Sequence, residues 1–430
     1  MPSFVFLLIY LVVFLIRPHE WYVLINENST IVRDSLLGCM ALFLFAQHKN
    51  FKTPQFALLM VLLIAVMVSH VLSGWVGGAM IYGQEFVETV VIPFVLFSGL
   101  VSTKGRQYLI FCIVIGAALL MVFNGHTQVA NGGVGYFGNA AVRDGQALRI
   151  TYLGLLSDPN DLGMFIVMTL PAVFLLKEKA PSWLRPVFWA VALTLLYGIY
   201  LTNSRGTLLA TIGLMFFWYW RKNGTKKSMW LGGAMSPVLL LVMANFRTIS
   251  ADDASSQGRL DAWWAGYQMF ASNPLSGVGQ HNFMDWYALH TAHNSFVLVM
   301  AELGFLGSAA WVGLLVVTTV ALFNISEKKF LAGKVELGEE HLASIDSEAL
   351  IAKSLLFSFV GYMVTGFFLS RTYTPLLYIY LAMAAACMGR VSRQLPKGVR
   401  LFDGGKVAKW TLLGTLGSIF GIYVLLKIFL

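Results

Sequence analysis

Apolar runs, each about as long as a bilayer is thick (roughly 15 to 20 residues), recur along the whole chain. Short polar segments separate them. The pattern predicts an all-α, polytopic transmembrane protein with about 12–13 spans, and its long outward loops are expected to hold short interfacial helices. Thirteen candidate helices are found, near residues 3–16, 32–47, 56–74, 81–101, 108–124, 161–176, 187–202, 207–220, 229–245, 293–323, 351–369, 373–389 and 410–428.

Two of these segments leave the number of spans open. The segment 293–323 is too long for one straight crossing, so we expect it to begin as an interfacial turn or helix before it enters the bilayer. The segment 410–428 is apolar enough to be a candidate, but the pattern does not decide whether it spans.

Composition excludes a soluble domain. Of the 430 residues, 57% are hydrophobic and only 12% are charged, which is too little charge to cover a water-exposed surface. A cleaved signal peptide is not expected, because the first apolar run lacks a basic start and is followed by Arg17-Pro18 instead of small residues. Cys39, Cys112 and Cys387 fall in apolar segments and predict neither disulfides nor a metal site.

The positive charges predict which loops are cytoplasmic. Alternate loops, at 48–55, 102–107, 177–186, 221–228, 324–353 and 390–409, hold 21 of the 30 Lys and Arg residues. Cytoplasmic loops of membrane proteins carry this excess. The N-terminus is therefore predicted to be cytoplasmic, and the remaining loops to face the periplasm of a bacterial inner membrane.

The outward loops use only arginine as a cation. A surface that grips phosphate with two parallel hydrogen bonds prefers the guanidinium fork to the lysine ammonium. The alternative is that arginine is simply well suited to the membrane interface. The eight outward arginines are Arg17, Arg33, Arg143, Arg149, Arg205, Arg247, Arg259 and Arg371.

Two outward loops, 125–160 and 246–292, are longer than a simple connection requires, and long loops in compact proteins are usually functional. The first ends in Ser157-Asp158-Pro159-Asn160-Asp161, which is a signal for a helix start with a capping residue. The second contains aromatic residues spaced to line one face of a short helix, which either lies in the interface near a lipid substrate or packs as a lid on other helices. The expected organisation has four parts: N-terminal transmembrane helices (1–124), a catalytic region (125–323), a charged cytoplasmic loop (324–353) and C-terminal transmembrane helices (354–430).

Three histidines in the second outward loop are the candidates for proton transfer. His281, His290 and His293 lie within thirteen residues of one another. Zinc would need three or four ligands, and no cysteine is near, so a metal site is not predicted. A general base needs only one histidine. His293, where the loop re-enters a helix, is the best candidate; a capping or merely interfacial role is the alternative.

Arginines in tight outward segments are the candidates for binding an anion. Arg205 lies in the turn Asn203–Gly206 between two apolar helices, where an unpaired arginine is costly unless it is functional. Arg259 precedes the aromatic helix, and a local pair with Asp261 is its alternative. Arg371 is placed similarly but is a weaker candidate.

Nucleotide chemistry is not predicted. The loops contain no phosphate-binding glycine motif of the Walker or dinucleotide type and no outward Asp-x-Asp for a divalent metal. We expect no cofactor and no nucleic-acid partner. The energy for a reaction on the outward side would therefore have to arrive in the substrate.

Four stretches between about 150 and 310 together resemble the O-antigen ligase and polymerase superfamily of bacterial envelope enzymes. The last of them fits a ligase-type pattern, in which His293-Asn294 is followed after nine residues by Gly304-x-x-Gly307. The stretches are Ser157-Asp158-Pro159-Asn160-Asp161-Leu162; Asn203-Ser204-Arg205-Gly206; Gly258-Arg259 with Asn273-Pro274-Leu275-Ser276-Gly277-Val278-Gly279; and His293-Asn294-Ser295 through Gly307.

The resemblance implies a metal-independent, inverting transfer of a glycan from undecaprenyl pyrophosphate to an acceptor hydroxyl on the periplasmic side. It implies that His293 is catalytic and that Arg205 and Arg259 bind the pyrophosphate. Arg371, Asn294 and His281 are further candidates. The partners implied are the lipid-linked glycan donor, membrane lipids, and an acceptor that is a lipid A-core, a glycan or a protein.

Alternatives remain open at this point. A polymerase would use a second lipid-linked glycan as acceptor, and a protein ligase would use a protein; the motifs do not separate them. A lipid-linked glycan transporter would place ionisable residues in mid-membrane, whereas here they gather in outward loops. Glu302 is the exception and is interpreted as structural, paired with a basic group elsewhere. Ser295 as a nucleophile lacks an evident acid partner.

Overall fold

The computed structural model describes residues 2–21, 29–46, 52–145, 147–249, 253–331, 339–396 and 398–429, without the side chains of 231, 234–249, 253–257 and 339–341. Arg247, one of the outward arginines, is among the side chains outside this description. The helices and strands are α1 Pro2–Ile16, α2 Ile31–Phe43, α3 Pro54–Leu72, α4 Val76–Phe86, α5 Ile92–Leu100, α6 Lys104–Ala130, β1 Val142–Asp144, β2 Ala147–Arg149, α7 Pro159–Lys179, α8 Arg185–Thr202, α9 Arg205–Ile249, α10 Asp253–Ser272, α11 Phe283–Trp286, α12 Ser295–Ser326, α13 Glu339–Gly366, α14 Pro375–Ser392 and α15 Gly404–Phe429.

The predicted all-α polytopic fold is confirmed. All thirteen predicted segments are helical, and ten helices in the described residues are long and apolar enough to cross a bilayer. The helix α2 has only 13 residues, about 20 Å at 1.5 Å per residue, which is shorter than the hydrocarbon core. The helix α9 covers two predicted segments and bends at Gly224. The C-terminal α15 is one of the ten.

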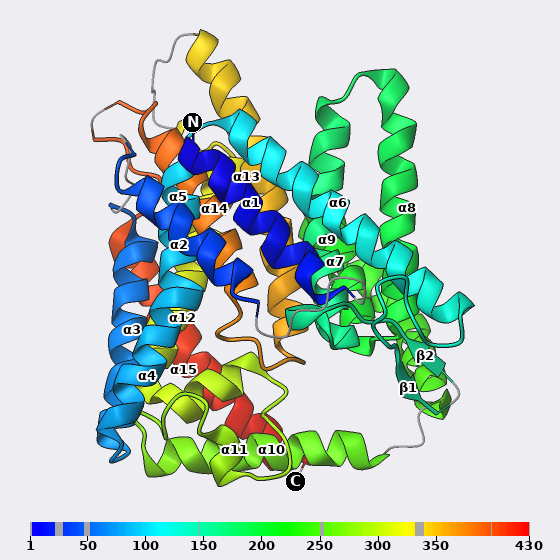
Figure 1. Ribbon diagram of the computed structural model, residues 1–430, viewed down its shortest axis with the longest axis vertical. Coiled ribbons are helices and arrows are strands. Elements are labelled where there is room, and N and C mark those ends of the chain that lie inside the picture. Colours follow the sequence, from blue (N-terminus) through cyan, green and yellow to red (C-terminus); the bar gives the residue numbers. More distant parts are fainter. Residues whose placement is uncertain are drawn as a thin grey trace.

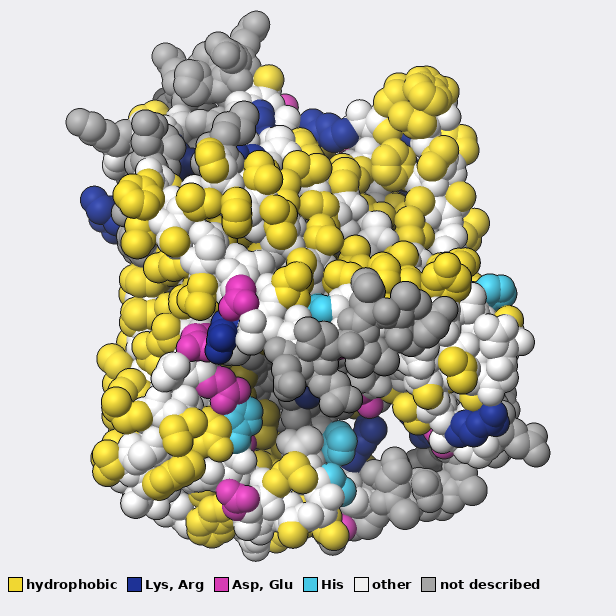
Figure 2. All heavy atoms as spheres, in the orientation of Figure 1, with side chains coloured by type: hydrophobic (Ala, Val, Ile, Leu, Met, Phe, Trp, Pro, Cys, Tyr) yellow, Lys and Arg dark blue, Asp and Glu magenta, His cyan; other side chains and the backbone are white. Residues whose placement is uncertain are grey.

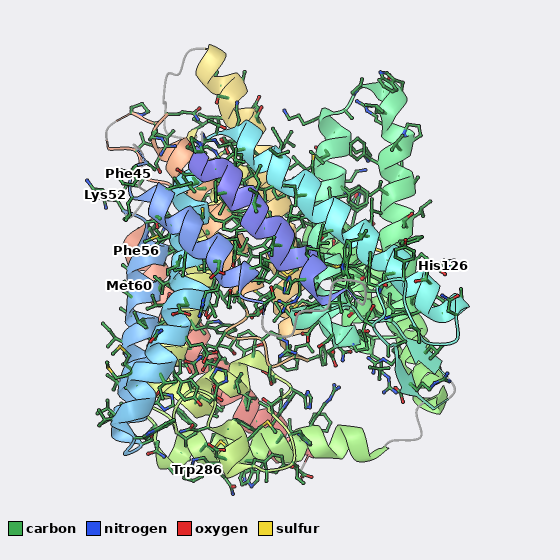
Figure 3. The ribbon with its side chains drawn as sticks, viewed as in Figure 1. Phe45, Lys52, Phe56, Met60, His126 and Trp286 are labelled. Carbon is green, nitrogen blue, oxygen red and sulfur yellow. The ribbon has the colours of Figure 1, made fainter. Side chains whose placement is uncertain are left out.

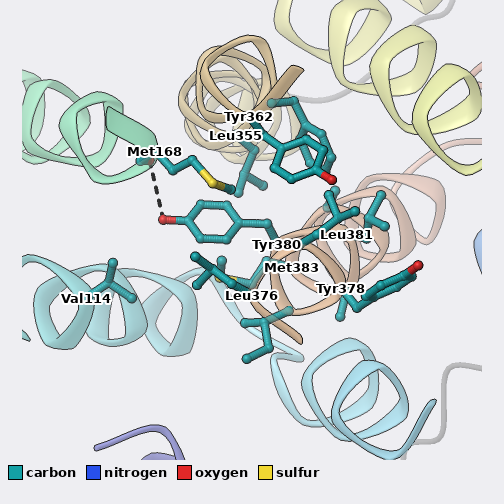
Figure 4. Packing of buried hydrophobic residues seen from close by; sticks show 14 of the residues in the cluster. Val114, Met168, Leu355, Tyr362, Leu376, Tyr378, Tyr380, Leu381 and Met383 are labelled. Atoms are coloured by element: carbon teal, nitrogen blue, oxygen red, sulfur yellow. Dashed lines mark hydrogen bonds between the residues drawn. The ribbon is translucent and has the colours of Figure 1, made fainter. Parts of the chain in front are cut away.

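The helices pack in a sequence of layers (Figure 1). Contacts run from α3 through α12 and α13 to α7 and α8, with α14 beside α13 and α15 beside α12. Proline begins several helices, where its missing N–H costs nothing, as at Pro54, Pro159 and Pro375. The core between the layers is mainly apolar. The Tyr380 hydroxyl still finds a partner there, donating to the Met168 carbonyl at 3.3 Å (Figure 4).

The helix α12 is interrupted, as its length predicted. Gly304 has φ +61° and ψ −156°, which ends the regular helix after nine residues. The loop at Pro274–Gly279 packs against this break through four backbone hydrogen bonds of 2.8 to 3.2 Å. They are Val278 N to Ala301 O, Gly279 N to Glu302 O, Phe305 N to Pro274 O and Leu306 N to Leu275 O. We call this arrangement the splice; it ties the second outward loop rigidly to α12.

Two predicted loops are partly regular structure. Residues 339–353, expected to be part of a charged loop, form the first half of α13, because Ile345, Glu348 and Ala349 are buried at helical spacing. Residues 332–338 lie outside the described chain. The loop 125–160 begins as the end of α6 and contains the antiparallel hairpin of β1 and β2.

Loops predicted to share a side of the membrane contact one another. At one end the contacts are Lys104–Ser344, Lys179–Ser347 and Arg390–Glu348; at the other they are Tyr152–Ile16, Arg371–Asp161 and His281–Glu85. Figure 3 shows Lys52 near the first end and Trp286 at the second. The segments that the charge pattern assigns to opposite sides of the membrane therefore make their contacts at opposite ends of the structure.

Candidate active site

His293 stands just outside the first turn of α12. Its backbone is left-handed, with φ +48°, a conformation that costs a non-glycine residue about 1 kcal/mol or more and is concentrated at functional sites. The next residue, Asn294, caps the helix: its side-chain oxygen accepts from Phe296 N at 2.8 Å and Val297 N at 3.2 Å. Asn294, a candidate from the motif, is therefore placed as a positioning residue that fixes the start of α12.

Ser295 is a structural anchor and not a nucleophile. Its fully buried hydroxyl donates to the Leu369 carbonyl at 2.6 Å and accepts from the Arg371 backbone N–H at 2.9 Å. The Thr372 hydroxyl donates to the Ser295 carbonyl at 2.8 Å. These bonds hold the segment 369–374, between α13 and α14, against the residues that carry His293.

Arg371 is committed to an ion pair. Its guanidinium forms a bidentate pair with the buried carboxylate of Asp161, in the first turn of α7. Burial alone would lower the pKa of Arg371, but the hydrogen bonds and charge of Asp161 outweigh it and raise the pKa. Asp158 caps α7 by accepting from Asn160 N at 2.7 Å, as the sequence predicted. Arg371 therefore joins α7 to the His293 side of the site.

Arg205 opens α9 after a sharp turn. Asn203 is left-handed (φ +46°), and the Ser204 hydroxyl accepts from the Thr207 N–H at 3.3 Å to cap the helix. Arg149, at the end of β2, holds this turn from outside: it donates to the Thr202 carbonyl at 3.2 Å and to the Asn160 side chain at 3.0 Å. Hydrogen bonds from Arg149 thus join the end of β2 to the start of α7 and to the turn before α9. We call this junction the corner.

Arg259 lies in α10, which crosses the outward end of the helices (Figure 1). Burial, followed by the charges of Arg205 and Arg149, lowers its pKa, while Asp158 acts in the opposite direction. Three guanidinium groups therefore share one electrostatic neighbourhood. Such a concentration of positive charge, served by two or three forks, suits a diphosphate.

Gly258 brings α10 close to the histidines, because a Cβ there would lie 3.1 Å from His290 Nε2. The rings of His290 and His293 are 5.3 Å apart between centroids. Burial first, and then the charges of Arg259 and His290, lower the pKa of His293 to about 4, with Asp158 opposing them. His293 is therefore neutral near pH 7 and has a free lone pair to accept a proton.

The predicted aromatic helix is α10, and its aromatic side chains pack on other helices. In α10, Trp263 is buried against Phe367, and Trp264 and Tyr267 stack with each other. Tyr267 also contacts Tyr423 of α15. Its aromatic side chains are therefore held by neighbouring helices at this end of the protein.

Two other polar side chains, those of His281 and Glu302, lie apart from the arginines. His281 is 3.9 Å from the Glu85 carboxylate of α4, measured between Nε2 and Oε1. Glu302 was expected to pair with a basic group, and this is wrong: no ion pair among the described residues includes it. Its carboxyl instead faces the Tyr373 hydroxyl and the backbone of His281 and Phe283.

The structure thus brings together His293, Arg205 and Arg259, which the sequence selected, and separates His281 from them. It adds Arg149, Asp158 and His290, which the sequence noted only as a cation, a helix cap and one of three histidines. Figure 2 shows basic, acidic and histidine side chains gathered around a hollow in this face, below an apolar band. The described residues contain no group of three or more His, Cys, Asp or Glu arranged to hold a metal ion.

Comparison with known proteins bears on the region that holds this site. Residues 190–312 match the family described as O-antigen ligase. This match supports assignment of the chain to the O-antigen ligase superfamily. The matched residues include Arg205, Arg259 and His293, so the predicted resemblance is confirmed. No curated protein matches the chain. The match supports a membrane glycan ligase or polymerase activity in general, with lipid-linked glycan and acceptor substrates.

Proposed function

We propose that this protein transfers a glycan from undecaprenyl pyrophosphate to an acceptor hydroxyl, with inversion and without a metal ion, on the periplasmic side of the bacterial inner membrane. The observation that carries the proposal is a neutral histidine beside a cluster of arginines, within the O-antigen ligase match. A base and a site for a diphosphate leaving group are the two parts that this reaction needs.

Arg205 and Arg259 bind the pyrophosphate, and Arg149 holds the corner from which Arg205 projects. The leaving group departs as a diphosphate, so the negative charge that develops needs neutralisation more than protonation. Fixed guanidinium groups provide this without reorganising during the reaction.

His293 removes the proton from the acceptor hydroxyl. The acceptor oxygen forms a bond to the anomeric carbon as the bond from that carbon to the phosphate oxygen breaks, and the electron pair leaves with the diphosphate. Attack from the side opposite the leaving group inverts the anomeric centre. Binding of the anionic donor cancels the charge of Arg259, so we expect it to raise the pKa of His293 and strengthen the base when substrate is present.

Reconstitution tests the proposal. The purified protein in liposomes, supplied with a glycan on undecaprenyl pyrophosphate and a lipid-anchored oligosaccharide, should release undecaprenyl pyrophosphate and form one new glycosidic bond. The mass of the product separates single transfer from polymerisation onto a second lipid-linked glycan and from transfer to a protein. Movement of intact donor across the bilayer with no new bond would contradict an enzyme and indicate a transporter.

A further inference from the structure

A second polar constellation lies beside the arginine site and takes no part in the mechanism above. Four segments contribute to it: α3, α4, the second outward loop with the interruption of α12, and the segment 370–374. We define the polar cluster as His70, Glu85, Gln280, His281, Glu302 and Tyr373. Tyr82 lies between two of its members, with its ring 4.6 Å from that of His70 and 5.3 Å from that of His281.

The polar cluster holds several buried polar atoms that no described protein group satisfies. The fully buried His70 ring faces the Gln280 backbone, but neither of its nitrogens makes a hydrogen bond of regular geometry, and Gln280 Oε1 makes none. The Tyr373 hydroxyl and the Glu302 carboxyl face each other, but the hydroxyl and Glu302 Oε2 make no hydrogen bond of regular geometry. Unpaired buried polar groups are costly, and their concentration in one place points to a ligand with many hydroxyl groups.

The position of Glu85 in the membrane supports the same conclusion. It lies nine residues into the candidate span Val76–Leu100, about 14 Å along the helix at 1.5 Å per residue, yet half of its side chain is exposed. A carboxylate at that depth is costly in hydrocarbon. Met80 and Ile81, on the same helix, are exposed and apolar. Glu85 therefore offers an exposed carboxylate next to His281, on a helix face where a membrane-anchored molecule can reach it.

The backbone around the polar cluster is also shaped for a site. The helix widens to a π-helical turn at Val87–Val91, directly after Glu85, and such turns are frequent at functional sites. His281 is left-handed, with φ +66°, as His293 is. Gly279 has φ +104°, and a Cβ there would lie 3.1 Å from His70 Nδ1, so only glycine lets the loop approach His70 so closely.

The polar cluster lies on the side of the site away from the arginines. Arg205, Arg259 and Asp161 belong to α9, α10 and α7, whereas the helical members of the polar cluster belong to α3, α4 and α12 (Figure 1). The segment 370–374 divides them: Arg371 pairs with Asp161 of α7, and Tyr373 faces Glu302 of α12. An inverting displacement needs the acceptor on the face opposite the leaving group, so an acceptor subsite is expected apart from the arginines.

We infer that the polar cluster is the acceptor subsite and binds a saccharide of a lipid-anchored acceptor. Carboxylate, imidazole, amide and phenol groups offer both donors and acceptors for neighbouring sugar hydroxyls. The inference rests on the proposed function and adds the class of acceptor and the residues that select it.

Two conservative variants test the inference in the reconstituted reaction with the undecaprenyl-pyrophosphate-linked glycan and a lipid-anchored oligosaccharide. Glu85→Gln and Tyr373→Phe each remove one hydrogen-bonding function with little change in volume. Each should raise the acceptor KM about tenfold or more, the usual effect of losing a polar contact to a sugar, while kcat changes little. Undecaprenyl pyrophosphate should bind as tightly as to the wild type. Asp285→Asn, at an exposed carboxylate of the same outward loop, is the matched control and should leave both values unchanged.

The outcomes separate the two proposals. If the wild type transfers no glycan, the proposed function is wrong. If the wild type transfers glycan but both variants keep the wild-type acceptor KM, the acceptor subsite is wrong and the proposed function stands. Loss of donor affinity in parallel with acceptor affinity, or transfer only to a protein acceptor, would also overturn the assignment of the polar cluster.

Discussion

Replacing Gly304 with alanine should break the splice that positions the second outward loop. Gly304 combines φ +61° with ψ −156°, a region occupied almost only by glycine. A Cβ at this position would lie 2.5 Å from Leu275 C and Ser276 N and 2.6 Å from Gly277 N. All three are backbone atoms, so no change of rotamer relieves the contact.

The size of the effect follows from these contacts. Backbone strain contributes about 1–3 kcal/mol. Displacing the loop also breaks the four backbone hydrogen bonds of the splice, each worth about 0.5–1.5 kcal/mol net. The expected loss is therefore about 3 to 9 kcal/mol, which is comparable with the whole stability of many proteins. Gly145 is the matched control, because it has the same φ of +60° but nothing within 4 Å of an added Cβ. Gly145→Ala should lose only about 1–2 kcal/mol.

The assay is thermal unfolding of the purified protein in detergent, followed by tryptophan fluorescence, with both variants measured beside the wild type. Gly304→Ala should unfold at a clearly lower temperature than Gly145→Ala, or fail to accumulate in the membrane when the control does. Equal unfolding temperatures for the two variants would refute the splice as a structural element. A stable Gly304→Ala protein with full activity would refute its role in placing His293.

Three further outcomes are expected. A cysteine at exposed Asn131 should react with a membrane-impermeant thiol reagent in intact spheroplasts, whereas one at exposed Thr225 should not, and the reverse labelling would invert the predicted orientation. Arg259→Lys should lose most activity and weaken undecaprenyl pyrophosphate binding, because lysine lacks the two parallel donors of the guanidinium group. Arg33→Lys, at a side chain that is 60% exposed, is the control and should be tolerated. Full activity of Arg259→Lys would mean that the preference for arginine reflects only its suitability for the membrane interface. Because the pKa of His293 is lowered to about 4, donor kcat/KM should stay flat from pH 7 to about 5 and fall near pH 4, whereas a histidine of ordinary pKa would lose about three quarters by pH 6.

Local patterns predicted the helices well, because bilayer-length apolar runs have few alternatives to helical structure. The cap at Asp158 and the interruption of the 293–323 segment followed from local composition and length. The first half of α13 did not, because its charged residues resembled a solvated loop. The burial of Ile345 and Glu348 depends on α14, which lies some thirty residues further along the chain.

Contacts between distant segments account for what the sequence did not predict in the site. The pair of Arg371 with Asp161 spans 210 residues, and nothing near either residue indicates the other. Arg149 was one of eight similar arginines until β2 placed it on the Arg205 turn. The surroundings of Glu302 required the loop of His281 and Phe283 to fold back onto α12, which no local pattern around Glu302 indicates.

The most direct test of the central claim is glycan transfer by His293→Ala in liposomes, with donor binding measured on the same preparation. The account predicts that transfer falls by about 10² to 10⁴-fold, the usual contribution of a general base. Undecaprenyl pyrophosphate should still bind with an affinity close to that of the wild type, because Arg205 and Arg259 remain. Transfer within a few-fold of the wild-type rate, with the same product, would contradict His293 as the base.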